Sequence, residues 1–152
     1  GTGNYGTGGI VGCDIFNKYL LFAPDMGSTI ENCVNSGSVT APRAGGILGS
    51  FVVAPGDSQA SRDIYSTISG CTNTGAISAS TTNGKCGAIY GAPISYAQGD
   101  AVVSHMKVEI QDCKVGGSVG NVTLTAENYS TYIAGSSLVD ANTGNVFYEE
   151  TN

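Results

Sequence analysis

The sequence predicts an all-β fold, a β-solenoid or β-helix-like stack of about three and a half repeats. Two short elements that recur along the chain carry this prediction, and no stretch combines helical apolar spacing with helix caps. Internal repeats of a few tens of residues indicate units that bury their apolar faces against their neighbours. An antiparallel β-sandwich is the alternative fold, with the segments between the repeated elements closed as hairpins.

The first repeated element is built around a cysteine and follows the pattern I-x-x-C-x-(N/V)-x-G-(S/A)-(V/I), in copies at residues 30–39, 68–77 and 110–119. Residues three positions apart point to opposite faces of a straight strand. We predict both the isoleucine and the cysteine as core residues, so the chain must bend between them, at Asn32, Gly70 and Asp112. The predicted repeat core is Ile30, Cys33, Ile68, Cys71, Ile110 and Cys113.

A second turn is expected directly after each of the first two cysteines. Asn35-Ser36-Gly37 and Asn73-Thr74-Gly75 supply asparagine and glycine, the two residue types that best tolerate a left-handed backbone. A short strand should follow each turn and bring the next Val or Ile back to the core. Each coil then alternates inward-pointing residues with corners.

The second repeated element is rich in glycine and precedes each cysteine element. It occurs as Gly9-Ile10-Val11-Gly12 and as Gly46-Ile47-Leu48-Gly49, then at residues 87–91 with one extra residue, and as a trace in Tyr132-Ile133-Ala134-Gly135. Each unit thus consists of a glycine-rich strand, a longer connecting segment, which we call an excursion, and two short strands. We predict one domain over residues 1–152, with units at about 8–44, 45–85, 86–131 and, in part, 132–152.

The last unit is expected to be incomplete. If the period continued, another Ile-x-x-Cys would begin near position 153 or 154, so residues 132–152 form half a repeat in this prediction, with a hairpin over 138–148. Open solenoid ends expose strand edges, which natural proteins normally cover. The chain is therefore expected to be part of a longer array, or a subunit that associates with itself end to end into a fibre.

Composition excludes several functional classes. The net charge is −6 and the six basic residues are scattered, so no basic stripe is available for nucleic acid. No run of 18 apolar residues occurs, which argues against membrane insertion. The chain begins with Gly and shows no signal peptide, so we interpret it as a mature or excised segment.

The sequence predicts no metal site, no cofactor and no catalytic residue. The five cysteines never form C-x-x-C, and His105 is the only imidazole. No motif places Cys13 or Cys86 beside it, and the 12 carboxylates do not recur at equivalent positions. The repeated cysteines are either buried thiols, which we favour, or inter-coil disulfides.

Tyrosines are the candidate binding residues. Several lie in or beside the excursions, where an exposed aromatic ring can stack on a sugar or contact another protein. Ordinary strand packing is the competing explanation for the same residues. The candidates are Tyr65, Tyr90, Tyr96 and Tyr129.

The two repeated elements together resemble the GLUG-type repeats of secreted surface proteins of gut bacteria, such as those of Bacteroides- or Clostridium-like organisms. The resemblance covers residues 8–135, although the units here are longer. It implies a β-rich, extracellular, cell-surface repeat with an accessory or adhesive role, and it transfers no catalytic residue. We therefore expect a non-enzymatic structural or adhesive domain whose partner is itself, a surface glycan or a surface protein. The alternatives are a carbohydrate-binding module of a larger secreted enzyme, and a β-solenoid polysaccharide hydrolase or lyase.

Overall fold

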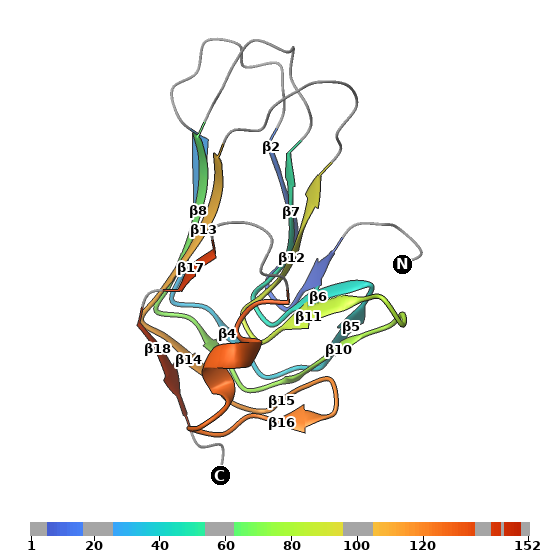
Figure 1. Cartoon of the computed structure of the whole chain (residues 1–152). Coiled ribbons are helices and arrows are strands. Elements are labelled where there is room, and N and C mark those ends of the chain that lie inside the picture. The colour runs from blue at the N-terminus through green and yellow to red at the C-terminus, as the bar shows by residue number, and fades with distance from the viewer. Residues whose placement is uncertain are drawn as a thin grey trace.

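The computed structural model describes residues 6–16, 26–53, 63–95, 105–135, 141–143 and 145–149. Within these ranges the chain is all-β apart from one short 3-10 helix, and its strands stack as successive coils (Figure 1). Corresponding strands of successive coils pair in parallel. The predicted β-solenoid-like stack is therefore confirmed, and the antiparallel sandwich does not fit these registers.

Each of the first three coils contributes five strands. The first comprises β1 (Thr7–Gly8), β2 (Val11–Phe16), β3 (Met26–Glu31), β4 (Val34–Asn35) and β5 (Val39–Ala41). The second comprises β6 (Arg43–Gly45), β7 (Leu48–Val53), β8 (Asp63–Ser69), β9 (Thr72–Asn73) and β10 (Ala76–Ala79). The third comprises β11 (Lys85–Gly87), β12 (Tyr90–Ser95), β13 (His105–Gln111), β14 (Cys113–Val115) and β15 (Ser118–Val119). The remainder comprises β16 (Val122–Thr123), η1 (Tyr129–Tyr132), β17 (Ala141–Thr143) and β18 (Val146–Tyr148).

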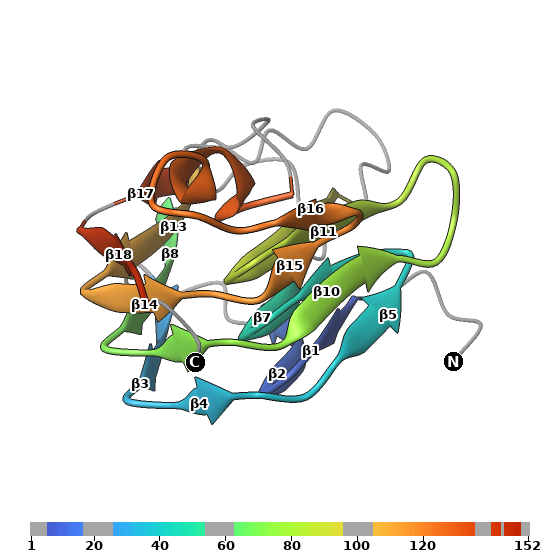
Figure 2. The ribbon, with the colours of Figure 1, turned by 90° about the horizontal axis from the view of Figure 1, so that it is seen from below.

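In the described part of the chain five sheets run along the stack, each with one strand from each of the first three coils (Figure 2). Their strand orders are β1-β6-β11, β2-β7-β12, β3-β8-β13-β17, β4-β9-β14-β18 and β5-β10-β15-β16. Among the described strands all pairs are parallel except β15 with β16, which form a short antiparallel hairpin. The register follows the sequence repeat, because Ile30 pairs with Ile68 and Ile68 pairs with Ile110.

The corners predicted between isoleucine and cysteine are confirmed. Asn32, Gly70 and Asp112 have φ of 54°, 59° and 51°, so all three adopt the left-handed conformation. That backbone is strained for most L-residues but accessible to Gly, Asn and Asp. The bend turns the isoleucine and the cysteine towards the same interior, as the core prediction requires.

The expected left-handed turn after the cysteine is wrong in the first two coils. Neither Asn35 nor Asn73 is among the described residues with positive φ, and only the third coil has a left-handed glycine there, Gly117 with φ of 71°. The asparagines instead point inward, with exposed fractions of 8% and 0%. Their side chains, rather than their backbones, make the turns.

The expected extra residue in the third glycine-rich element is also wrong. Leu48 pairs with Tyr90, and Gly45 pairs with Gly87. The first three copies of the element therefore each have five residues, Gly-(Gly/Ala)-Ile-x-Gly, and the third copy aligns without a gap. This register places Tyr90 in the inward column of Val11 and Leu48.

The last coil differs from the predicted half repeat. Thr143 pairs with Ile110 and Val146 with Cys113, so the fourth copy of the cysteine element lies within the chain and begins about ten residues before the expected position. Strands β17 and β18 run parallel to β13 and β14, so the predicted hairpin over 138–148 is wrong. Thr143 and Val146 replace Ile and Cys here, so the fourth copy does not match the repeat pattern in the sequence.

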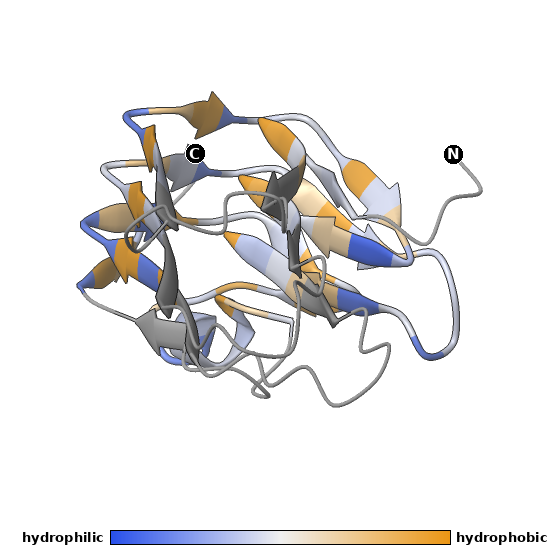
Figure 3. Ribbon diagram, turned by 90° about the horizontal axis from the view of Figure 1, so that it is seen from above, coloured by the Kyte–Doolittle hydropathy of each residue, from blue (hydrophilic) through white to orange (hydrophobic). Residues whose placement is uncertain are grey.

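Apolar residues recur at matching places in successive layers of the stack (Figure 3). Most of the buried residues form one cluster that includes the isoleucine and cysteine columns and extends to Leu124 and Ile133. A smaller cluster lies around β5, β6 and β10 and contains Val39, Ala44 and Ile77. The coil interior therefore consists of stacked columns, as expected for units that are buried only by their neighbours.

Candidate functional site

The repeated cysteines form a column inside the stack. Cys71 and Cys113 are fully buried, whereas Cys33 in the first coil is only partly buried. Each thiol donates to the carbonyl two residues earlier, with Sγ–O distances of 3.2 Å for Cys33, 3.4 Å for Cys71 and 3.3 Å for Cys113. The backbone N–H of Cys33 also lies 3.4 Å from the Sγ of Cys71. The three thiols thus make equivalent hydrogen bonds, with Cys71 and Cys113 in the core and Cys33 packed against its edge.

Burial makes these thiols weaker acids than an exposed cysteine. Loss of hydration raises the pKa of Cys71, and it raises the pKa of Cys113 to about 11. The thiolate is the nucleophilic and metal-binding form of cysteine, so both side chains stay protonated and inert at neutral pH. Cys33, Cys71, Cys86 and Cys113 are all free thiols, which agrees with the favoured prediction of buried thiols over inter-coil disulfides.

The remaining candidates for nucleophilic chemistry lie on different sheets. Cys86 is in β11 and Cys13 is in β2, whereas His105 begins β13. The side chain of His105 is outside the described part of the structure. Strand pairing therefore does not place Cys13 or Cys86 next to His105.

The structure separates the four candidate tyrosines. Tyr90 is only 2% exposed, so the prediction of Tyr90 as a surface aromatic is wrong. Its ring fills the core position of Leu48, and its hydroxyl is buried without a hydrogen-bond partner among the described residues. Tyr129 is partly exposed, with its ring centroid 6.4 Å from that of Tyr148. Tyr65 lies in β8 with its side chain outside the described part, and Tyr96 lies wholly outside it.

An asparagine ladder joins the first two coils and was not predicted from the sequence. Asn35 Nδ2 donates to Asn73 Oδ1 over 2.7 Å. The Oδ1 of Asn35 accepts from the N–H of Gly37 at 3.2 Å, and the Oδ1 of Asn73 accepts from the N–H of Gly75 at 3.4 Å. Each buried amide therefore accepts a hydrogen bond from its own turn and also bonds to the amide of the other coil, as buried polar groups require.

Glycines on the opposite side of the coil make room for the ladder. A Cβ on Gly9 would overlap the side chain of Asn35, and a Cβ on Gly46 would overlap that of Asn73. In the third coil the paired positions are occupied by Ala88 and Val115, and the polar ladder ends. The sequence does show this coupled change from Gly and Asn to Ala and Val, but only once the five-residue glycine element is aligned without a gap.

A second polar ladder ends at the same coil. Ser28 Oγ lies 2.8 Å from Ser66 Oγ, and Val108 occupies the corresponding position in β13. A third pair, Thr40 and Ser78, makes a hydroxyl contact of 2.8 Å on the exposed side of β5 and β10. Polar pairs therefore join the first two coils, and in the third coil apolar residues, Val115 and Val108, occupy the positions of the asparagine and serine pairs.

The attachment points of the three excursions lie side by side. Strands β2, β7 and β12 end next to one another, because Phe16 and Ser95 both pair with Val53. Strands β3, β8 and β13 begin next to one another, because Ile64 pairs with both Met26 and Met106. These strands extend away from the rest of the stack in Figure 1. The segments that link them, 17–25, 54–62 and 96–104, are outside the described residues. The strand ends to which these segments attach, here called the excursion roots, lie on one side of the stack.

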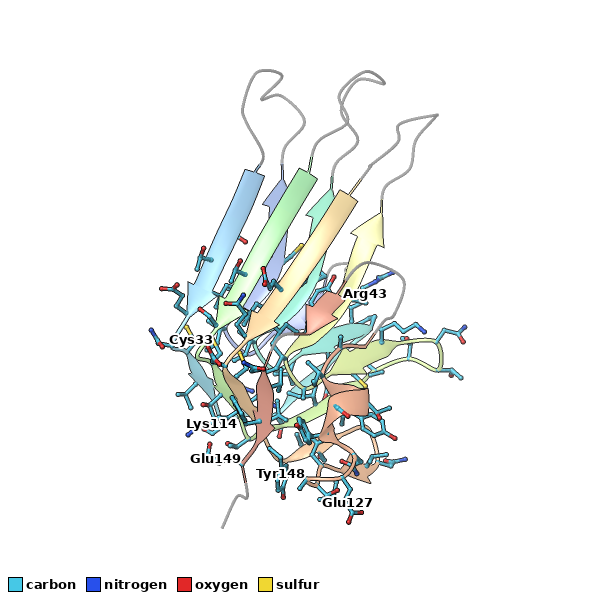
Figure 4. The ribbon with its side chains drawn as sticks, turned by 60° about the vertical axis from the view of Figure 1, so that its left-hand side comes forward. Cys33, Arg43, Lys114, Glu127, Tyr148 and Glu149 are labelled. Atoms are coloured by element: carbon cyan, nitrogen blue, oxygen red, sulfur yellow. The ribbon has the colours of Figure 1, made fainter. Side chains whose placement is uncertain are left out.

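Charged side chains are sparse in the part that the structure describes. Lys114 Nζ lies 3.3 Å from Glu149 Oε1 on the outer face of β14 and beside β18 (Figure 4). Both side chains are about half exposed, so the pair contributes little stability. No group of three or more His, Cys, Asp or Glu side chains among the described residues is arranged to hold a metal ion. None of the described helices has the length and hydropathy of a membrane span.

Comparisons with protein-family models, curated proteins and solved structures found no match for this chain. The resemblance to GLUG-type repeats therefore stays a prediction from the repeated residues.

Proposed function

We propose that this chain is a non-enzymatic, extracellular repeat domain of a bacterial surface protein, with a structural or adhesive role. The observation that supports it is that the excursion roots lie side by side. They are carried by a stack whose coils are joined by columns of core residues and by polar ladders. Binding residues are disproportionately found on loops that a rigid scaffold positions. The resemblance to GLUG-type repeats supports the location at the cell surface.

The scaffold and the excursions have contrasting sequence character, which fits this division of labour. The coils repeat the same core residue types at the same positions, whereas the segments 17–25, 54–62 and 96–104 have no common pattern. In solenoid proteins, insertions that differ from repeat to repeat and lie on one side of the stack often form the binding face. In this proposal the partner is a surface glycan or a surface protein.

A binding screen tests the proposal. The purified chain is applied to a glycan array and to immobilised extracellular-matrix and bacterial-surface proteins. Binding to at least one of them is expected, together with loss of binding when residues 54–62 are replaced by a Gly/Ser segment of equal length. The matched control replaces the turn at residues 81–84, which connects β10 to β11 on another side of the stack. The adhesive role is wrong if no ligand is bound, or if replacing each of the three segments leaves binding unchanged.

A carbohydrate-binding module is the second candidate function. It is favoured by Tyr129 and Tyr148, which are partly exposed and whose rings meet at a 33° tilt. Aromatic rings of this kind provide stacking surface for sugars at low entropic cost. Loss of glycan binding in Tyr129→Ala, with binding retained when residues 54–62 are replaced, would favour this function over the first.

A further inference from the structure

The second coil carries a loop that the first coil lacks. Pro42 alone joins β5 to β6, whereas residues 80–84 join β10 to β11. The base of this loop is fixed to the first coil, because the N–H of Ser80 donates to the carbonyl of Ala41 and that of Lys85 donates to the carbonyl of Pro42, both over 2.9 Å. The loop therefore leaves the register of the coils unchanged, and it extends beyond the stack (Figure 2).

The tip of this loop places a glycine directly after an exposed asparagine. Residues 80–83 are all exposed, and the N–H of Gly84 closes the turn by donating to the carbonyl of Thr81 over 2.9 Å. A Cβ on Gly84 would lie 2.6 Å from the Cβ of Ala79 and 3.0 Å from the carbonyl oxygen of Pro42. Close packing at the base of the loop therefore requires glycine at position 84, and Asn83 precedes it.

The side chain of Asn83 differs from the asparagines of the ladder. Asn35 and Asn73 are buried and hydrogen-bonded, whereas the amide of Asn83 makes no hydrogen bond among the described residues. Glycine has no Cβ, so its backbone nitrogen is approached more easily than that of a residue with a branched side chain. The Asn83 amide is thus free to turn towards the nitrogen of Gly84.

We propose that Asn83 is a site of spontaneous modification, at which the folded protein converts this asparagine to aspartate and isoaspartate. The nitrogen of Gly84 loses its proton to hydroxide and attacks Cγ of Asn83. A bond forms between these two atoms, the bond from Cγ to Nδ2 breaks, and Nδ2 leaves with protons as ammonia. Water then opens the succinimide ring at either carbonyl, which gives aspartate or isoaspartate.

The reaction needs no partner other than water. One water is consumed, one ammonia is released, and nothing is oxidised or reduced. The hydrogen bond from Gly84 to Thr81 must open before the attack, and it lies at an exposed loop tip, where local opening is least costly. The rate should rise with hydroxide concentration, because the attacking nitrogen must be deprotonated.

The product changes the charge of the loop without disturbing the coils. A carboxylate at position 83 is ionised at neutral pH and adds one negative charge to the net charge of −6. The nearest charged residue in the sequence is Lys85, which pairs with Arg43 of the neighbouring strand. The fold therefore accepts the new charge beside two basic residues. This inference does not depend on the adhesive role.

Peptide mass spectrometry of the intact folded chain, aged in mildly alkaline buffer, tests the proposal. We expect conversion of Asn83 to aspartate and isoaspartate at least ten times faster than conversion of Asn121. Asn121 is the matched control, because it is also exposed in a turn, but Val122 follows it. Asn35 and Asn73 should stay unchanged. Conversion of Asn83 no faster than that of Asn121 would overturn the proposal.

Ageing the same chain in urea separates the effect of the fold from that of the sequence. Asn83 should react in both states, whereas Asn35 and Asn73 should react measurably only when unfolded. Reaction of Asn83 in urea but not in the folded protein would show that the turn blocks the attack, and the proposal would be wrong. Asn83→Gln should abolish the modification at this position, because its longer side chain closes the ring much more slowly.

Asn83→Asp tests whether the fold accepts the product. This variant should elute from an ion-exchange column with the aspartate form of the aged protein, and it should unfold at the same urea concentration as the unmodified chain. A clearly lower midpoint of unfolding would contradict the inference that the loop carries the new charge without disturbing the coils.

Discussion

Asn35 of the first coil donates a hydrogen bond of 2.7 Å to Asn73 of the second, with both side chains buried inside the stack. Each amide also holds the turn that follows it, through the N–H groups of Gly37 and Gly75. The ladder thus links two turns that are 38 residues apart in the chain. Its energetic weight depends on complete pairing, because an unmatched buried amide is strongly unfavourable.

Replacing the inner asparagine should destabilise the protein. Asn73→Val removes the acceptor of both Asn35 Nδ2 and the Gly75 N–H, and leaves these donors buried. Valine fits the site, since Val115 occupies it in the third coil. We expect the free energy of unfolding to fall by about 1–3 kcal/mol in chemical denaturation. Ser78→Ala, which removes only the exposed contact with Thr40, should change it by less than about 0.5 kcal/mol. Equal stability of Asn73→Val and the unmodified protein would contradict the ladder.

Removing both asparagines should cost less than the sum of the two single changes. Asn35→Val and Asn73→Val each leave a partner amide unpaired, whereas the double variant leaves neither. We expect a coupling energy of about 0.5–3 kcal/mol in a double-mutant cycle measured by denaturation. The same cycle on Thr40 and Ser78, whose hydroxyl contact is exposed to solvent, should give a much smaller coupling. Additive effects at the asparagines would show that the two coils do not communicate through this pair.

The sequence predicts the stack well because its strongest constraints are local and repeated. The isoleucine and cysteine columns and the corner between them follow from a fixed spacing, and both are found at Ile68 and Cys71. The fourth copy is invisible because Thr143 and Val146 keep the pairing but change the residue types. Pairing depends on the backbone, so it survives substitutions that remove a sequence pattern.

The candidate site was less predictable, because it depends on which face each residue presents. Its place beside an excursion makes Tyr90 a candidate surface aromatic, with strand packing as the competing explanation, and the register puts it in the core. Asn35 was assigned to a left-handed turn on residue type alone, although its inward direction makes it a ladder residue. Neighbouring residues of a strand face opposite sides, so residue type alone does not decide between interior and surface.

The corner residue between the isoleucine and the cysteine should tolerate only a few residue types. Gly70 has φ of 59°, and its equivalents are Asn32 and Asp112. Gly70→Ala places a Cβ in the left-handed region and should lower the free energy of unfolding by about 1–2 kcal/mol. Gly70→Asn should lower the free energy of unfolding by less, because Asn32 already adopts this conformation in the first coil. Thermal and urea denaturation of the two variants measure the difference, and a more stable Ala variant would contradict the left-handed corner.

Loss of the Tyr90 hydroxyl should be neutral or stabilising. The hydroxyl is buried and has no hydrogen-bond partner among the described residues. An unpaired buried polar group is unfavourable, so Tyr90→Phe should raise the free energy of unfolding by up to about 1 kcal/mol while the ring continues to fill the column. Tyr129→Phe, at a partly exposed ring, should have no measurable effect. A clear loss of stability in Tyr90→Phe would show that the hydroxyl is bonded.

Stability should fall in alkaline solution because two core thiols resist ionisation. Burial raises the pKa of Cys113 from 9.0 to about 11 and raises that of Cys71, so the unfolded chain loses these protons first as pH rises. Their contribution is complete below pH 9 and is lost as pH rises to about 11. We expect the free energy of unfolding to decrease across this window, and less steeply in Cys113→Val, which copies Val146 of the next coil. An identical slope in both proteins would contradict the assignment. Alkylation at pH 8 should also label partly buried Cys33 well before Cys71 and Cys113.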